Sequence, residues 1–217
     1  MLGFSTNTTP ATRLLVIRHG QSLWNQAGII QGQQDIALSE LGERQAAAVA
    51  ARLSSAPIAA VYASPLCRAL QTAAVVADPH DLAVQTDADL AEIHHGEWEG
   101  MTEADVAQSY GELLEMWLTR PAQVQMPEGE HFSDVRERGL RAMDRIVAAH
   151  PGQMVAVVTH DVIVRVVIAY ALGLPDDHVT RFMVNNAALN VIEYGPGGPM
   201  VICVNDTSHL ETLQQND

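Results

Sequence analysis

The amino-acid sequence predicts an α/β fold, a three-layer α/β/α sandwich around a mostly parallel sheet. Short apolar runs of the length found in buried parallel strands alternate along the chain with segments of helical periodicity. Strands that alternate with helices favour a parallel sheet covered by helices on both faces. The chain has 217 residues, of which 47% are hydrophobic and 18% charged, so it is long and apolar enough to bury one sizeable core. We therefore expect a single domain over residues 1–217.

The first half of the chain contains the clearest of these elements. Strands are expected at 14–17, 58–63 and 82–85, and a helix follows each of the first two strands. Ser39 is the predicted N-cap of the first helix, which is rich in alanine. Ser64 and Pro65 are the predicted N-cap and first helical residue of the second helix.

Residues 91–131 follow no regular pattern. They contain one expected helix near 102–118, together with the helix breakers Pro121, Pro127 and Gly129. A long irregular excursion from a compact domain is more often a lid or a substrate-facing insertion than part of the scaffold. We expect residues 91–131 to form such a lid.

The second half of the chain continues the alternation. We expect a helix at 133–149, a strand at 154–158, an apolar helix ending near 173, and two further strands at 189–194 and 200–204. The last two strands flank a Gly-Pro-Gly-Gly-Pro sequence, which is typical of a tight connection. They are therefore expected to form a hairpin or an edge pair.

The charge composition excludes several classes of protein. All 12 basic residues are arginine and there is no lysine, which rules out a Walker-type phosphate loop, a Schiff-base lysine and a pyridoxal-phosphate enzyme. The 26 acidic residues give a formal net charge of −14, which disfavours binding to a nucleic-acid backbone. We expect no nucleic-acid partner.

The sequence indicates neither secretion nor membrane insertion. Residues 1–10 lack a basic stretch followed by an apolar run, so no signal peptide is expected there. Arg165 interrupts the longest apolar run, which leaves no segment of the roughly 18 residues that a membrane span needs. Cys67 and Cys203 are too few for a disulfide framework and form no C-x-x-C pair. We expect a cytoplasmic protein without membrane association.

Polar residues follow three of the expected strands directly. Arg18 and His19 follow the first strand, a segment from Ser64 to Arg68 follows the second, and His160 follows the fourth. Because the carboxyl ends of parallel strands face one crevice, we expect these residues to converge. Each group alone is ordinary at a turn or on a solvated helix face. Two arginines, two histidines and a helix N-terminus together indicate a binding site for a doubly charged anion.

The same segments carry longer motifs. They read RHGQSLWN at 18–25, QG at 31–32, LSELG at 38–42, ASPLCRALQTA at 63–73, LAEIHHGEWEG at 90–100 and VVTH at 157–160. In this order, and over about residues 13–206, the sequence resembles the histidine phosphatase superfamily in its phosphoglycerate mutase-like branch. The first motif is highly specific in this context. The resemblance implies a phosphoglycerate mutase-like form of the sandwich.

The resemblance also implies a mechanism. His19 matches the family's nucleophile, a neutral imidazole that attacks phosphorus and carries the phosphoryl group as a phosphohistidine. Glu92 matches the proton donor, which protonates the leaving oxygen and later activates water. The implied activity is that of a phosphomonoesterase, a histidine acid-type phosphatase that acts on a small phosphorylated metabolite.

Six further residues match phosphate-binding groups of the family. Arg18, Arg68 and His160 match those that hold the phosphoryl oxygens and stabilise charge in a loose transition state. Peripheral contacts to phosphate are implied for the other three, which are Asn25, Gln31 and Gly32. Because the arginines supply the positive charge, we expect neither a metal nor another cofactor.

Two departures from the family pattern lie within these motifs. Asp161 follows His160, where members usually have glycine. A carboxylate pointing inward there is expected to lower the affinity for phosphate. His94 and His95 replace the usual apolar or aromatic residues before Gly96, and they either contact substrate or lie at the surface.

Several alternatives remain open beside the phosphatase. Mutases of this family carry a lysine and an arginine pair in a longer insertion, whereas residues 101–126 contain Arg120 as their single basic residue. A phosphatase is therefore favoured over a phosphoglycerate mutase. A metal-dependent hydrolase and a serine hydrolase are disfavoured because the chain has no H-E-x-x-H and no G-x-S-x-G motif. The presence of all five central residues argues against a non-catalytic phosphate-binding protein.

Overall fold

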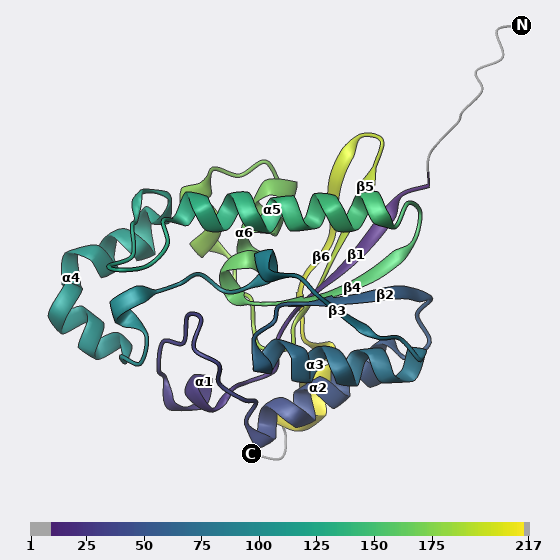
Figure 1. Cartoon of the computed structure of the whole chain (residues 1–217), viewed down its shortest axis with the longest axis horizontal. Helices are drawn as coiled ribbons and strands as arrows, with labels where there is room; N and C mark the ends of the chain where they lie inside the picture. Colours follow the sequence, from purple (N-terminus) through teal and green to yellow (C-terminus); the bar gives the residue numbers. More distant parts are fainter. Residues whose placement is uncertain (1–9, 215–217) are drawn as a thin grey trace, which may run out of the picture.

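A six-stranded sheet forms the centre of the molecule (Figure 1). The structure, a computed structural model, describes residues 10–214. The strands are β1 (Thr12–Arg18), β2 (Ile58–Ala63), β3 (Val84–Thr86), β4 (Met154–Thr159), β5 (Leu189–Gly195) and β6 (Gly198–Asp206). Their order across the sheet is β3-β2-β4-β1-β5-β6. The first four of these run parallel, while β5 pairs antiparallel with both β1 and β6, so the expected mostly parallel sheet is confirmed.

Helices cover both faces of the sheet. The α-helices are α1 (Leu23–Ala27), α2 (Glu40–Leu53), α3 (Cys67–Ala77), α4 (Glu103–Thr119), α5 (Phe132–Ala149), α6 (Asp161–Ala171) and α7 (Glu211–Gln214). Short 3-10 helices lie at Asp78–His80, Ala88–Leu90, Gly96–Trp98, Pro121–Gln123, Asp176–Arg181 and Ser208–Leu210. Helices α5 and α6 lie on one side of the sheet, and α2 and α3 lie on the other (Figure 1). The three-layer sandwich is confirmed.

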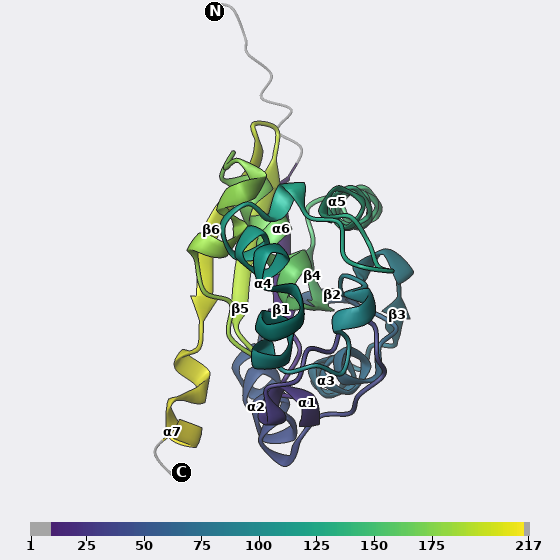
Figure 2. The same ribbon diagram turned by 90° about the vertical axis from the view of Figure 1, so that its left-hand side faces the viewer.

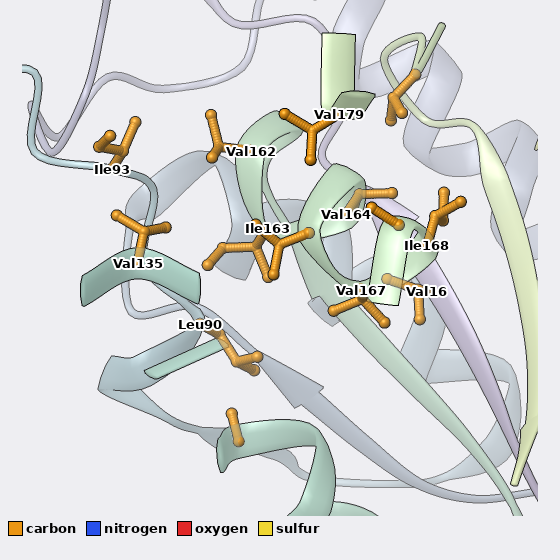
Figure 3. Close-up of a cluster of buried hydrophobic side chains, with 14 of the residues drawn as sticks. Val16, Leu90, Ile93, Val135, Val162, Ile163, Val164, Val167, Ile168 and Val179 are labelled. Atoms are coloured by element: carbon orange, nitrogen blue, oxygen red, sulfur yellow. The ribbon is translucent and has the colours of Figure 1, made fainter. Parts of the chain in front are cut away.

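The alternation of side chains along β1 produces two cores. Leu14 and Val16 point into the cluster beneath α5 and α6, which Figure 3 shows in part. Leu15 and Ile17 point into the cluster beneath α2 and α3. Because successive side chains of a strand point to opposite faces, a strand covered on both sides must be apolar throughout. This is why the central strands read as continuous apolar runs.

Some helix starts differ from the expectation. Helix α3 begins at Cys67 and not at Pro65, and its N-cap residue Leu66 makes no side-chain capping bond. The Ser64 hydroxyl forms a hydrogen bond with His160 Nε2 instead, over 2.7 Å. Helix α5 begins one residue before Ser133, with His131 as its N-cap. Helix α1 was not expected, since five residues are too few to show a helical period.

The expected lid segment lies beyond the carboxyl ends of the strands. Helix α4 is the expected helix, although its backbone leaves helical geometry at Tyr110, where φ is −137° and ψ is 35°. In Figure 2, α4 lies in front of the strands at this end of the sheet. The position of α4 explains how residues distant in sequence come to surround one space above the strand ends.

The described residues also bear on location. Within residues 10–214, no helix combines the length and hydropathy required to cross a bilayer. The segment in which no signal peptide is expected lies almost entirely outside the described residues, and the cytoplasmic location stays a prediction.

Candidate active site

Three neighbouring strands bring the central residues together. β2, β4 and β1 are adjacent in the sheet, so the residues that follow them meet at one edge. The rings of His19 and His160 lie 5.0 Å apart, centroid to centroid. Arg68 Nε donates to His19 Nε2 over 3.2 Å. All three side chains are buried. The convergence expected from the strand ends is confirmed.

The surroundings of His19 fix its protonation. Its Nδ1 lies 2.7 Å from the carbonyl oxygen of Gly20, and a carbonyl only accepts, so the ring proton is on Nδ1. Nε2 then carries the lone pair of the ring, in agreement with the bond it accepts from Arg68. Burial, followed by the charges of Arg68 and Arg18, holds the pKa of His19 well below its ordinary value. The ring is therefore a neutral imidazole with an unprotonated Nε2.

Arg68 is held by backbone carbonyls. Its two terminal nitrogens donate to the carbonyl oxygens of Gln34 and Gly32, both over 2.8 Å. With Nε bonded to His19, every nitrogen of this guanidinium has a partner. Its side chain is therefore fixed beside the imidazole before any ligand arrives.

Arg18 has a buried nitrogen without a partner in the described part of the chain. Its Nη1 donates to the carbonyl oxygen of Val184 and, over 3.2 Å, to Asp161 Oδ1. Arg18 Nε is buried and has no hydrogen-bond partner among residues 10–214. A buried donor without a partner is costly, so this nitrogen is suited to an anionic ligand.

His160 likewise offers one free ring nitrogen. Its Nε2 lies 2.7 Å from Ser64 Oγ, whereas Nδ1 is buried and has no partner in the described part of the chain. The Ser64 oxygen also accepts from the Leu66 N–H, over 3.3 Å. If the Ser64 hydroxyl donates to Nε2, the ring proton lies on Nδ1, where it can be given to an anion. Burial and the charge of Arg68 lower the pKa of His160, which keeps the ring neutral.

Glu92 is a buried carboxyl group in the same cleft. Its side chain accepts from the N–H of Ile93 over 2.9 Å. Burial, followed by the negative charge of Asp161, raises the pKa of Glu92 to about 7, against the opposing effects of the Ile93 N–H, Arg68 and Arg18. A carboxyl with this pKa can both donate and accept a proton near neutral pH.

A cleft of about 400 Å³ connects these groups. It is lined by seven of the eight predicted site residues, namely Arg18, His19, Asn25, Gln31, Gly32, Arg68 and Glu92. His160 packs against His19 instead. The remaining walls are largely aliphatic and aromatic, formed by Ile29, Ile30, Trp98, Leu114, Trp117, Leu118 and Val162. The cleft therefore combines two arginines, Arg18 and Arg68, with a largely apolar wall.

The three peripheral residues are tied to the protein. The Asn25 side chain accepts from the N–H of Ser22 and from Asn186 Nδ2. Gln31 Oε1 accepts from Ser22 Oγ over 2.6 Å. Gly32 has a φ of +50°, and its carbonyl oxygen holds Arg68.

The two departures from the family pattern have clear positions. Asp161 lines the cleft and bridges Arg18 and Arg165, whose Nε donates to Asp161 Oδ2 over 2.8 Å. His95 is in the cleft wall, stacked on Trp98, and its burial lowers its pKa to about 4. His94 is more open, with 41% of its side chain exposed. The two histidines thus divide between the alternatives left open, His95 in the cleft and His94 toward the solvent.

Sequence reasoning missed three residues near the site. Ser64 was expected as a helix cap at one of the converging strand ends but not as the partner of His160, which it contacts. Asn186 donates to the carbonyl oxygen of His19 over 3.2 Å, and no motif pointed to it. No motif pointed to Arg138 either, although its Nη2 donates to the carbonyl oxygen of Glu92.

Known proteins resemble this chain over nearly its whole length. The family model of the histidine phosphatase superfamily (branch 1) matches residues 14–207. Phosphoserine phosphatase 1 of Hydrogenobacter thermophilus is 33% identical over 198 residues, which are 91% of this chain and 94% of that protein. The solved structure of Bacillus stearothermophilus YhfR has a TM-score of 0.89 and 34% identity, covering 92% of this chain and 100% of that one.

A third relative is longer than this chain. A bifunctional protein of Mycobacterium tuberculosis is 37% identical over 201 residues, and the match covers 92% of this chain but 55% of that protein. The site described above, a neutral histidine beside two arginines at the strand ends of an α/β sandwich, has the chemistry of an anion-binding site. The chain belongs to the histidine phosphatase superfamily.

Proposed function

We propose that this protein is a phosphatase that hydrolyses small phosphomonoesters through a phosphohistidine on His19. The observation that carries the proposal is the placement of an unprotonated His19 Nε2 in one cleft with Glu92, a carboxyl with a pKa of about 7. A nucleophile and a proton donor with complementary protonation are what transfer from an ester requires. The relative named phosphoserine phosphatase 1 supports this chemistry.

The reaction takes two steps. In the first, His19 Nε2 forms a bond to phosphorus while the bond from phosphorus to the leaving oxygen breaks, and Glu92 gives that oxygen its proton. The alcohol leaves, and the phosphoryl group stays on His19. In the second, water attacks phosphorus, Glu92 takes a proton from the water, and the bond from nitrogen to phosphorus breaks. Phosphate leaves, and both residues return to their starting states.

Arg18, Arg68 and His160 stabilise charge in both steps. Arg68 lies beside His19 in a fixed orientation, and the free nitrogens Arg18 Nε and His160 Nδ1 can donate to phosphoryl oxygens. In a loose transition state, charge spreads over these oxygens, so donors placed beforehand contribute most. Asn25, Gln31 and Gly32 are proposed as peripheral contacts because they line the same cleft.

The cleft favours hydrolysis over transfer between two hydroxyls. Its basic lining residues within the described chain are Arg18 and Arg68, and the other charged residues are the acidic Glu92, Glu103 and Asp161. A mutase must hold a bisphosphate, which requires further cations. We also propose that residues 13–206 form one catalytic domain and that 91–131 act as its lid, since α4 contributes to the cleft wall.

Product analysis in the presence of a chelator tests this function. With 3-phosphoglycerate and other phosphate esters, free phosphate should appear without isomerised product, and EDTA should leave the rate unchanged. His19→Ala should abolish turnover, whereas His131→Asn, which replaces a helix cap outside the cleft by another good cap, should not. Efficient isomerisation would favour the mutase, loss of activity with EDTA a metal-dependent hydrolase, and phosphate binding without turnover a binding protein.

A further inference from the structure

We propose that Arg138 is a positioning residue for the acid Glu92, a role that rests on the function of Glu92 proposed above. Arg138 lies on α5, on the far side of the segment that carries Glu92, and it has no place in the cleft lining. Its side chain is only 11% exposed. Arginine side chains are usually exposed to solvent, so an arginine that is buried to this extent must be stabilised by specific contacts.

All five N–H donors of Arg138 are used. Nη1 donates to the carbonyl oxygens of Asp89, over 3.0 Å, and of Ala91, while Nη2 donates to that of Glu92 over 2.8 Å. Nε and Nη2 also form a two-pronged pair with the carboxylate of Glu130, each over 2.8 Å. Three of the five bonds therefore fix the backbone immediately before and at the acid residue.

The segment is held on its other sides as well. Glu130 passes the restraint on, because its carboxylate accepts from the N–H of His94 over 2.8 Å. The side chains of Leu90 and Ile93, on either side of Glu92, are fully buried in the same cluster as Val135 of α5 (Figure 3). Since the Glu92 carboxyl is bonded to the N–H of Ile93, the position of this backbone sets the position of the acid.

Two other arginines on α5 show what a purely structural contact would look like. Arg141 and Arg145 pair with the carboxylates of Asp89 and Asp87, and about half of each arginine side chain is exposed, 52% and 46%. Exposed ion pairs of this kind contribute little. Arg138 differs because three of its five bonds go to backbone carbonyls of residues 89–92, the segment that ends at the acid. Lysine, a point donor on a flexible stem, cannot reproduce this fork.

The expected consequence is a loss that depends on the leaving group. Proton donation matters when the leaving oxygen is a poor alkoxide, and it matters little when a stable phenolate leaves. A displaced acid therefore slows an alkyl phosphate more than a nitrophenyl phosphate. A displacement of about 1 Å can cost about 100-fold. For Arg138→Met we expect kcat/KM to fall roughly 10- to 100-fold further on glycerol 2-phosphate than on p-nitrophenyl phosphate.

The test compares kcat/KM on these two substrates, because kcat/KM reports the steps up to departure of the alcohol. The measured quantity is kcat/KM on glycerol 2-phosphate divided by kcat/KM on p-nitrophenyl phosphate, called the substrate ratio below. Arg138→Met, Arg138→Lys and Glu92→Gln are measured beside Arg141→Met, the same substitution on the same helix at an exposed site. Arg138→Met should change the ratio of the two substrates in the same direction as Glu92→Gln. The substrate ratio of Arg138→Lys should lie between those of wild type and Arg138→Met. Arg141→Met should leave the substrate ratio unchanged. In the double variant that combines Glu92→Gln with Arg138→Met, the second substitution should cause no further change in the substrate ratio.

The outcomes separate the two proposals. Equal losses on both substrates for Arg138→Met, or full additivity in the double variant, would overturn the positioning role while Glu92 keeps its own. If the loss in Glu92→Gln does not depend on the leaving group, Glu92 is not the acid, and the positioning role of Arg138 is overturned as well. If Arg138→Met does not fold, Arg138→Lys decides alone: a ratio equal to that of wild type overturns the inference.

Discussion

Replacing Glu92 by glutamine should remove the acid and stabilise the fold at alkaline pH. Glutamine keeps nearly the same shape and can still accept the bond from the Ile93 N–H, but it carries no exchangeable acid proton. The carboxyl is buried, and its pKa in the folded protein is about 7, compared with an ordinary value of 4.5. Burial therefore penalises its charged form.

The size and sign of the effect follow from this shift. A difference of roughly 2.5 pKa units corresponds to about 3 kcal/mol. Because the pKa is raised on folding, the contribution of protonated Glu92 to stability is complete below pH 4.5 and is lost as pH rises through 7. Glutamine does not ionise and loses nothing. The free energy of unfolding of Glu92→Gln, relative to wild type, should therefore rise by about 3 kcal/mol between pH 4.5 and 8.5.

Urea unfolding at these two pH values measures the difference, and single-turnover phosphorylation measures the cost in activity. We expect a loss of about 10²- to 10⁴-fold on an alkyl phosphate and a much smaller loss on p-nitrophenyl phosphate. Single turnover is needed because the same variant lacks the base for breakdown of the phosphohistidine. A stability difference that stays constant with pH would refute the burial argument, and equal losses on both substrates would make Glu92 a structural or binding residue.

Two further predictions concern groups beside the central ones. Asp161→Asn removes a charge that raises the pKa of Glu92, so the alkaline limb of kcat/KM on an alkyl phosphate should move to lower pH. Phosphate should also inhibit more strongly, because Arg18 loses a competing carboxylate. An alkaline limb at the same pH as in wild type would contradict the first effect. Ser64→Ala removes the hydroxyl bonded to His160, so kcat/KM should fall about 10-fold, the value of one hydrogen bond. The melting temperature should fall by about 2–4 °C for each kcal/mol lost, because a buried ring nitrogen loses its partner. A rate within about twofold of wild type would show that the tautomer of His160 does not depend on this bond.

The scaffold was predictable because its signals are local. A strand buried on both faces must be apolar along its length, and this rule located β1, β2 and β4. The edge strand β3 is largely exposed and lies at Val84–Thr86, not at the expected 82–85. The approximate site followed from the same topology, since the residues after adjacent parallel strands must share one edge. This rule alone predicts that His19, Arg68 and His160 converge.

The rest depends on partners that the sequence does not reveal. Ser64 has the local chemistry of a helix cap, yet its hydroxyl bonds His160, 96 residues away. Arg138 lies on the same helix as the half-exposed Arg141 and Arg145, and only the packing of α5 against the segment that carries Glu92 buries it. The direction of the Asp161 carboxylate was open for the same reason, because Arg165 and Arg18 settle it together.

The central claim is covalent transfer of the phosphoryl group to His19, and trapping that adduct tests it most directly. Glu92→Gln mixed rapidly with p-nitrophenyl phosphate should accumulate the intermediate, because the phenolate leaves without an acid while water lacks its base. Quenching in alkali and mapping by mass spectrometry should then find an acid-labile phosphoryl group on His19, which His19→Ala lacks. An adduct on another residue, or turnover of His19→Ala at the wild-type rate, would contradict the mechanism.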